Sequence, residues 1–137
     1  MSVKHTIALG LALFLSLSIL AGVAEAGKGG HRNAAGSGSG SLSLVLLNST
    51  DGLAHYGQNV TFTVSSTVSQ PWVNLTCYQN GDWVTNQYVG FYAGYPWSQV
   101  FPLATWKWTG GAADCTARLF DGLTNATLGS MSFHAYE

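Results

Sequence analysis

Two cysteines, Cys77 and Cys115, are the only cysteines in the 137-residue chain. Each lies in a short run whose alternate residues, on the cysteine's own side of an extended strand, are small or apolar. Two core thiols at neighbouring positions can join as a disulfide, which persists in oxidising compartments. Closing a loop of this length stabilises a fold by roughly 4 kcal/mol in the chain-entropy model. We therefore predict a disulfide between Cys77 and Cys115; two buried free thiols are the alternative.

Histidines are the next candidates for chemistry. His55 follows Asp51 by four residues, which on a helix would place both side chains on one metal ion. Asp51-Gly52 indicates a turn instead, and no third ligand is near in the sequence. His134 alternates onto the solvent side of a predicted strand, and His31 lies in a Gly/Ser-rich segment. We expect all three to be surface histidines.

Motifs for metal, nucleotide or hydrolase chemistry are absent from the sequence. The four aspartates are scattered, without the D-x-D or D-x-N-x-D spacing of a calcium loop. No H-E-x-x-H, G-x-S-x-G or G-x-x-x-x-G-K-[ST] motif occurs. We therefore expect no catalytic residues, no cofactor and no metal, and we expect that the protein is not an enzyme.

Aromatic residues form the one unusual concentration. Nine of them lie between positions 83 and 108, where a single lysine is the only charge after the first tryptophan. Part of this set must belong to a core. Alternation predicts that Trp106 and Trp108 share one face and that Phe101 and Leu103 share another.

Other aromatic residues of this stretch lie where a strand would leave them exposed, or in the irregular segment 90–97. They are Trp83, Tyr88, Tyr92, Tyr95 and Trp97. Tyrosine and tryptophan offer a large contact area with a polar handle. Exposed, they would suit a sugar face or a protein partner, and we predict them as ligand-binding residues. Packed together, they would instead close the open side of a small sandwich.

The elements that position these residues begin after an apolar leader. A basic start, an almost wholly apolar run from 7 to 24 and the tripeptide Ala24-Glu25-Ala26 are typical of a signal peptide. We expect residues 1–26 to be removed, so that the mature chain starts at Gly27. An uncleaved membrane anchor is the alternative. The predicted location is secreted or extracellular, with no membrane span after cleavage.

Residues 27–41 are rich in glycine and serine and contain no large apolar residue, so we expect a flexible linker. Residues 42–137 then form one domain. The domain carries two cations, Lys107 and Arg118, against five carboxylates. This balance cannot neutralise a row of phosphates, so we expect no nucleic-acid partner.

Alternation of apolar and polar residues dominates from Leu42 onward, and no helical period is sustained. The strongest turn signal, Asn80-Gly81, predicts a two-residue type I′ hairpin. The strands that we predict cover residues 42–47, 58–66, 72–79, 82–90, 97–104, 113–120 and 127–136. Seven to eight short strands in this length favour an all-β, antiparallel sandwich.

The strand count, the cysteine of Ala113-Asp114-Cys115 and Trp72 at the start of the third predicted strand resemble the immunoglobulin-like superfamily. The resemblance covers residues 41–137, and small exported bacterial and phage virion proteins often carry such modules. An antibody-type domain has its first cysteine on the second strand and pairs it across the sheets. Here the Asn80-Gly81 hairpin places Cys77 on the third strand, so we expect a bridge between neighbouring strands of one sheet. The antibody-type tyrosine two residues before the late cysteine is replaced by alanine.

From these features we expect a secreted, non-catalytic immunoglobulin-like module. It would bind a macromolecular partner, a protein or a glycan, at a cell surface or in an extracellular assembly. The alternative is a carbohydrate-binding module that stacks sugars on Tyr92, Tyr95 and Trp97. A minimal hydrolase is the least favoured possibility.

Overall fold

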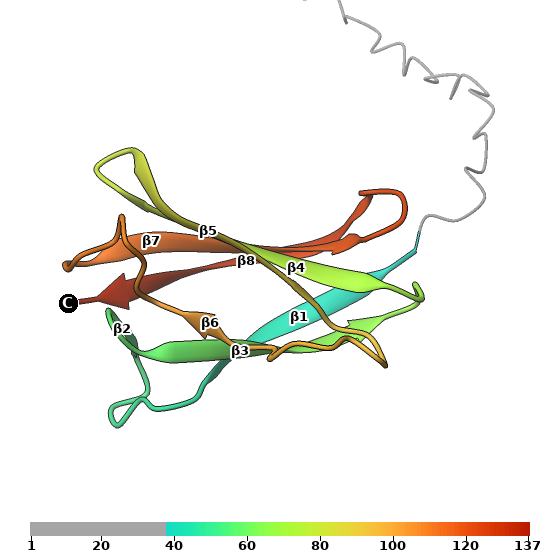
Figure 1. The fold of residues 1–137 in the computed structure, drawn as a ribbon, viewed down its shortest axis with the longest axis horizontal. Coiled ribbons are helices and arrows are strands. Elements are labelled where there is room, and N and C mark those ends of the chain that lie inside the picture. Colours follow the sequence, from blue (N-terminus) through green and yellow to red (C-terminus); the bar gives the residue numbers. More distant parts are fainter. Residues whose placement is uncertain (1–37) are drawn as a thin grey trace, which may run out of the picture. The chain divides into compact units, whose positions relative to one another are not determined.

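The computed structural model describes residues 38–137, so the predicted signal peptide and most of the predicted linker lie outside the described residues. This part of the chain is all β, with eight strands in two sheets (Figure 1). The strands are β1 (Gly40–Leu46), β2 (Ala54–His55), β3 (Asn59–Ser66), β4 (Pro71–Gln79), β5 (Asp82–Gly90), β6 (Phe101–Pro102), β7 (Ala113–Asp121) and β8 (Thr127–Tyr136). One sheet has the order β1-β3-β6 and the other β2-β8-β7-β4-β5.

Six predicted strands are present within two residues of their expected bounds. β1 begins at Gly40, so the last two residues of the predicted linker belong to a strand. The strand predicted over 97–104 is wrong for most of its length, because only Phe101 and Pro102 pair with β3. Proline lacks the N–H that a ladder needs, and side-chain bonds hold the segment before it instead: the Gln99 amide donates to the Gly90 carbonyl at 2.9 Å.

The short strand β2 was not predicted, and it changes the sheet type. Ala54 and His55 pair in parallel with Ala135 and Tyr136 of β8. All other strand pairs are antiparallel, so the expectation of a wholly antiparallel sandwich is wrong at this edge. The physical reason is the loop before β2, which carries the chain from β1 in one sheet to the edge of the other.

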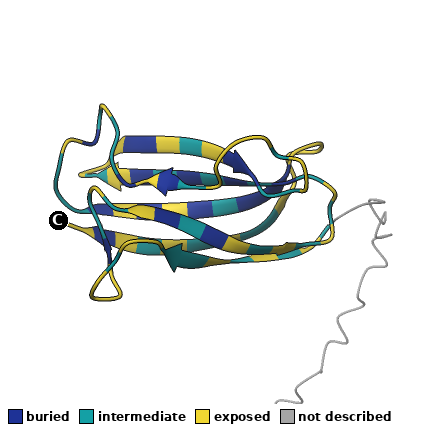
Figure 2. Cartoon of the chain, turned by 60° about the horizontal axis from the view of Figure 1, so that its bottom comes forward, coloured by how far each residue is buried: buried dark blue, intermediate teal, exposed yellow. Residues whose placement is uncertain are grey.

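The core lies between the two sheets and is built from alternate residues of the strands (Figure 2). The buried core positions of β4 and β7 that alternate along the strands are Val73, Leu75, Cys77, Ala113, Cys115, Ala117 and Leu119. From the other sheet, Phe62 meets Phe101 edge to face with 5.4 Å between ring centroids. Phe101 and Leu103 are fully buried. Period-two alternation therefore predicted the inward face of the main strands correctly.

Cys77 and Cys115 lie directly opposite each other on β4 and β7 and form a disulfide. The predicted bridge between neighbouring strands of one sheet is confirmed. The hairpin between β4 and β5 is confirmed as well: Asn80 has φ 50° and Gly81 has φ 89°, and a type I′ turn requires positive φ at both central residues. A disulfide agrees with an extracellular environment. Between residues 38 and 137 no helix is long and apolar enough to cross a membrane.

Candidate functional site

Exposed aromatic side chains gather on the outer face of the five-stranded sheet. Because Val73, Leu75 and Cys77 point into the core, the residues between them on β4 and their partners on β5 and β7 point outward. We call this surface the outer aromatic face; it consists of the exposed Tyr78, Trp83 and Tyr88, the half-buried Arg118, and Phe120, which is only 9% exposed. The predicted residues Trp83 and Tyr88 belong to it, with exposed fractions of 46% and 53%.

Contacts within this face hold its side chains in place. Tyr88 meets Phe120 edge to face, with 6.3 Å between ring centroids. The guanidinium of Arg118 lies 4.5 Å from the centre of the Phe120 ring, a cation–π arrangement. Arg118 also donates to the Asn125 amide oxygen at 2.7 Å and to the Thr127 hydroxyl at 3.2 Å. A cation fixed in this way loses little conformational entropy when a partner binds.

Uncharged polar side chains fill the centre of the same face. Asn74 donates to the Asn86 side-chain oxygen at 2.6 Å, across the β4–β5 pair. Thr116 and Ser132 share a hydrogen bond of 3.1 Å across the β7–β8 pair, and Thr76 lies between the two pairs in register. The face therefore combines aromatic ends with a neutral, hydrogen-bonding middle.

The other predicted aromatic residues form a separate cluster near the start of β4, which we call the end cluster: Trp72, Tyr92, Tyr95 and Trp97. The ring centroids of Tyr95 lie 5.5 Å from those of Trp72 and Tyr92 and 5.4 Å from that of Trp97. Tyr92 and Tyr95 are half-buried, whereas Trp97 is 69% exposed. The structure thus divides the five predicted ligand-binding residues between two surfaces, and only Trp97 in the end cluster is largely open.

The prediction for Trp106 and Trp108 is wrong. Trp108 is fully buried and Trp106 is 86% exposed. Residues 105–108 form a turn, in which the Thr105 hydroxyl accepts from the backbone N–H groups of Lys107 and Trp108 at 3.2 and 3.0 Å. Strand alternation does not apply to a turn, so one of the two rings is buried and the other is exposed. Trp108, not Trp72, is the buried tryptophan of this sandwich; Trp72 is half-buried among the rings of the end cluster.

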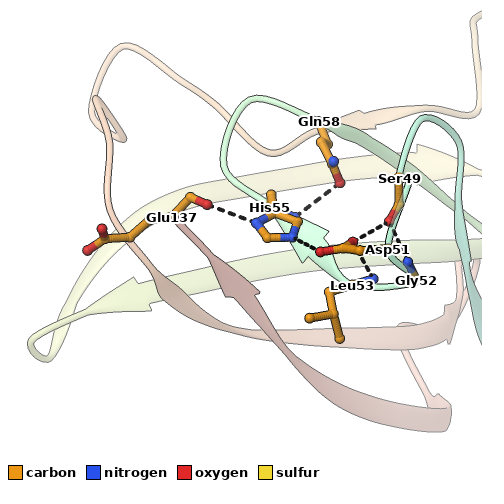
Figure 3. A network of polar contacts seen from close by, with 7 residues as sticks. All are labelled: Ser49, Asp51, Gly52, Leu53, His55, Gln58 and Glu137. Atoms are coloured by element: carbon orange, nitrogen blue, oxygen red, sulfur yellow. Dashed lines mark hydrogen bonds and ion pairs between the residues drawn. The ribbon is translucent and has the colours of Figure 1, made fainter.

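A polar network around His55 was not predicted as a unit (Figure 3). The imidazole Nε2 lies 2.8 Å from a carboxylate oxygen of Asp51, and Nδ1 lies 2.8 Å from the Glu137 carbonyl oxygen. Both partners are acceptors, so both ring nitrogens donate when the ring is protonated. Asp51 accepts further bonds from the Leu53 N–H and the Ser49 hydroxyl, each at 3.0 Å. The spacing of four that we considered for a metal site therefore brings Asp51 and His55 together as a hydrogen-bonded pair across a turn.

The pKa values of this pair shift in opposite directions. The Leu53 N–H, followed by the His55 ring, lowers the pKa of Asp51 to about 2. The Glu137 carbonyl, followed by Asp51, raises the pKa of His55 above 6.5. Each shift has the same cause, since the hydrogen bonds favour the charged form of the group.

The network joins the loop before β2 to the end of the chain after β8. It contains no activated nucleophile. The Ser49 hydroxyl donates to Asp51 and not to the imidazole, whose nitrogens are both engaged. A second histidine, His134, lies 2.7 Å from Asp114 on the exposed side of β7 and β8. In the described part of the chain, no three His, Cys, Asp or Glu side chains are close enough to share a metal ion.

No known protein family, curated protein or solved structure matches this chain.

Proposed function

We propose that the protein is a secreted, non-catalytic immunoglobulin-like module that binds a protein partner at a cell surface or in an extracellular assembly. The outer aromatic face is the proposed binding surface. One observation carries the proposal: Trp83 and, further along β5, Tyr88 with a fixed Arg118 lie on one sheet face whose middle is uncharged. Tryptophan, tyrosine and arginine are the residues in which interface hot spots are enriched.

The strand order supports the immunoglobulin-like part of the proposal. The order β1-β3-β6 corresponds to strands A, B and E, and β8-β7-β4-β5 corresponds to G, F, C and C′. Two features depart from the antibody-type domain. The disulfide joins the C and F equivalents within one sheet, and the buried tryptophan comes from the loop after β6.

The composition of the outer face supports binding to a protein. Interface cores are depleted in charge and enriched in aromatic residues and arginine. The neutral middle of the face offers hydroxyl and amide groups, and a protein partner could satisfy them with its own backbone. The end cluster supports binding less well, because Tyr92 and Tyr95 pack against each other and against Trp72.

The test is capture of a partner from the native extracellular fluid on the immobilised exported protein. We expect Tyr88→Ala and Arg118→Ala each to reduce capture of that partner by at least about tenfold, as truncation of a hot-spot residue does. Trp97→Ala is the matched control, because it removes an exposed aromatic ring outside the face. Capture that Tyr88→Ala leaves intact, or no specific capture by the native protein, would refute the proposal.

A further inference from the structure

A groove of about 280 Å³ lies beside β5, at the edge of the five-stranded sheet. It is lined by Trp83, Val84, Thr85, Asn86, Gln87, Thr105 and Trp106. The groove shares Trp83 with the outer aromatic face, whereas Tyr88, Arg118 and Phe120 do not line it. None of the lining residues carries a charge, so the groove does not favour an ionic ligand.

Contacts between β5 and the turn at 105–108 keep the groove in shape. The Thr105 hydroxyl donates to the Val84 carbonyl at 2.7 Å. The Lys107 ammonium lies 3.8 Å from the centre of the Trp83 ring, a cation–π contact that joins the turn to the strand. These contacts leave Trp106 projecting at the rim with 86% of its surface exposed. The groove therefore has an open indole beside a fixed wall.

The polar groups of the groove are oriented and only partly used. The Gln87 amide nitrogen donates to the Thr85 hydroxyl at 2.8 Å and to the Pro102 carbonyl at 2.9 Å, which leaves its oxygen as an acceptor. The Asn86 oxygen accepts from Asn74 and Thr76, which leaves its amide nitrogen as a donor. Among the described residues neither of these two remaining groups has a hydrogen-bond partner. The residues that line the groove thus offer one free donor and one free acceptor on side chains that are already held.

An added β-strand fits this edge poorly. A strand that extends the sheet needs the outward backbone groups of β5, but Thr105 occupies the Val84 carbonyl. The Gln87 side chain and Pro102 bridge the edge further along. Covering an edge with a loop is a common protection against such pairing. A small ligand with its own hydroxyl groups is the better fit.

We propose that this groove binds a neutral saccharide. A sugar ring presents an apolar C–H face and a rim of hydroxyl groups. The face would stack on the Trp106 indole, and the hydroxyls would meet the Asn86 donor and the Gln87 acceptor. Trp83 also lines the groove, with its ring held by Lys107. The inference goes beyond the proposed protein-binding function: the two sites share Trp83 and Asn86, but Trp106 and Gln87 belong to the groove alone, and Tyr88 and Arg118 to the outer aromatic face alone.

Calorimetric titration of the exported protein with the hexasaccharides of cellulose, starch, mannan and chitin tests this proposal. We expect at least one of these probes to bind, and Trp106→Ala to weaken its Kd roughly tenfold or more. Trp106→Phe should retain part of the affinity, because a phenyl ring still offers a stacking face. Trp97→Ala, which removes the other highly exposed indole, should leave the Kd unchanged.

Absence of binding by all four probes would overturn the proposal, and so would equal losses on Trp106→Ala and Trp97→Ala. Melting curves of each variant separate loss of binding from loss of folding, and exposed positions such as Trp106 are expected to leave the melting temperature nearly unchanged. Tyr88→Ala should leave the saccharide Kd unchanged. If the Kd were unchanged in Tyr88→Ala and no protein partner were captured, the results would support the saccharide site and refute the protein-binding face.

Discussion

His55 ties together segments that are far apart in the sequence. Its ring joins Asp51 in the loop before β2 to Glu137 after β8 (Figure 3). The backbone N–H of the same residue donates to the Gln58 side chain at 3.1 Å. Because β2 has only two residues of pairing with β8, the bond from the ring to the Glu137 carbonyl adds to the attachment at this edge, beside the backbone bond from Tyr56 to Tyr136. The charge state of His55 should therefore affect how firmly the edge is held.

The pKa shifts predict a pH dependence of stability with a definite sign. The pKa of His55 is raised in the folded state, so its contribution is complete below 6.5 and is lost as pH rises through the folded-state pKa. The pKa of Asp51 is lowered, so its contribution is present above 3.8 and is lost as pH falls toward about 2. We expect a larger free energy of unfolding from this pair at about pH 5 than at about pH 8. Denaturant titrations of the native protein and of His55→Gln at both pH values measure the difference.

NMR titration of the His55 ring provides the direct check. The pKa should exceed 6.5 in the native protein and fall in Asp51→Asn, although the Glu137 carbonyl will keep part of the shift. Asp82→Asn is a suitable control, because Asp82 lies in the hairpin between β4 and β5 and makes no bond to His55. A ring that titrates at or below 6.5 would show that the two acceptors do not stabilise the imidazolium.

Residues inside regular strands could be predicted from the sequence, whereas those in turns could not. The burial of Cys77 and Cys115 follows from strand alternation, and so does the exposure of Tyr88. Trp106 lies in a turn that is fixed by hydrogen bonds to the Thr105 hydroxyl. Such bonds leave no periodic pattern in the sequence, so they could not be predicted from it. The candidate saccharide groove was missed for the same reason, since one of its walls is this turn.

At the scale of elements, the long strands are specified locally and the short ones by their surroundings. β5 has the predicted bounds because the Asn80-Gly81 turn fixes its start and its pairing with β4. β2 and β6 have two residues each, too few for an alternating pattern to be read. Their pairing depends on the position to which the preceding loops bring the chain. That position is set by the assembled fold and not by the local sequence.

The hairpin between β4 and β5 gives a prediction at this scale. Gly81 has φ 89° and a Cβ added there would meet no atom within 4 Å, so only backbone conformation opposes a side chain. We expect Gly81→Ala to lower the free energy of unfolding by about 1–2 kcal/mol. Asn80→Gly should be nearly neutral, because glycine adopts the required positive φ readily. Chemical denaturation measures the free energy of unfolding of both variants. If Gly81→Ala were as stable as Asn80→Gly, the turn would not constrain the register.

For the molecule as a whole, the disulfide joins two central strands of the larger sheet, β4 and β7. A domain of this size buries a modest share of its surface, so a cross-link matters to its net stability. We expect Cys77→Ala with Cys115→Ala to lower the free energy of unfolding by about 4 kcal/mol in the chain-entropy model. Alanine is the appropriate replacement because both cysteines are buried. Thermal and denaturant unfolding of the double variant measure the loss, and an unchanged midpoint would contradict the expected contribution.

If the protein is exported, an oxidising compartment keeps its two cysteines joined. If the leader is a signal peptide cleaved after Ala26, the protein recovered from outside the cell will begin at Gly27. Its intact mass will also be two hydrogens below that of the dithiol, because an oxidising compartment preserves the Cys77–Cys115 bridge. Expression of a chain that starts at Gly27 inside a reducing cytosol is the matched control, and we expect it to contain free thiols and to unfold more easily. A retained leader would contradict the predicted cleavage. A titre of two thiols in the exported protein would instead contradict the predicted role of the disulfide, since the sandwich would then be stable without it.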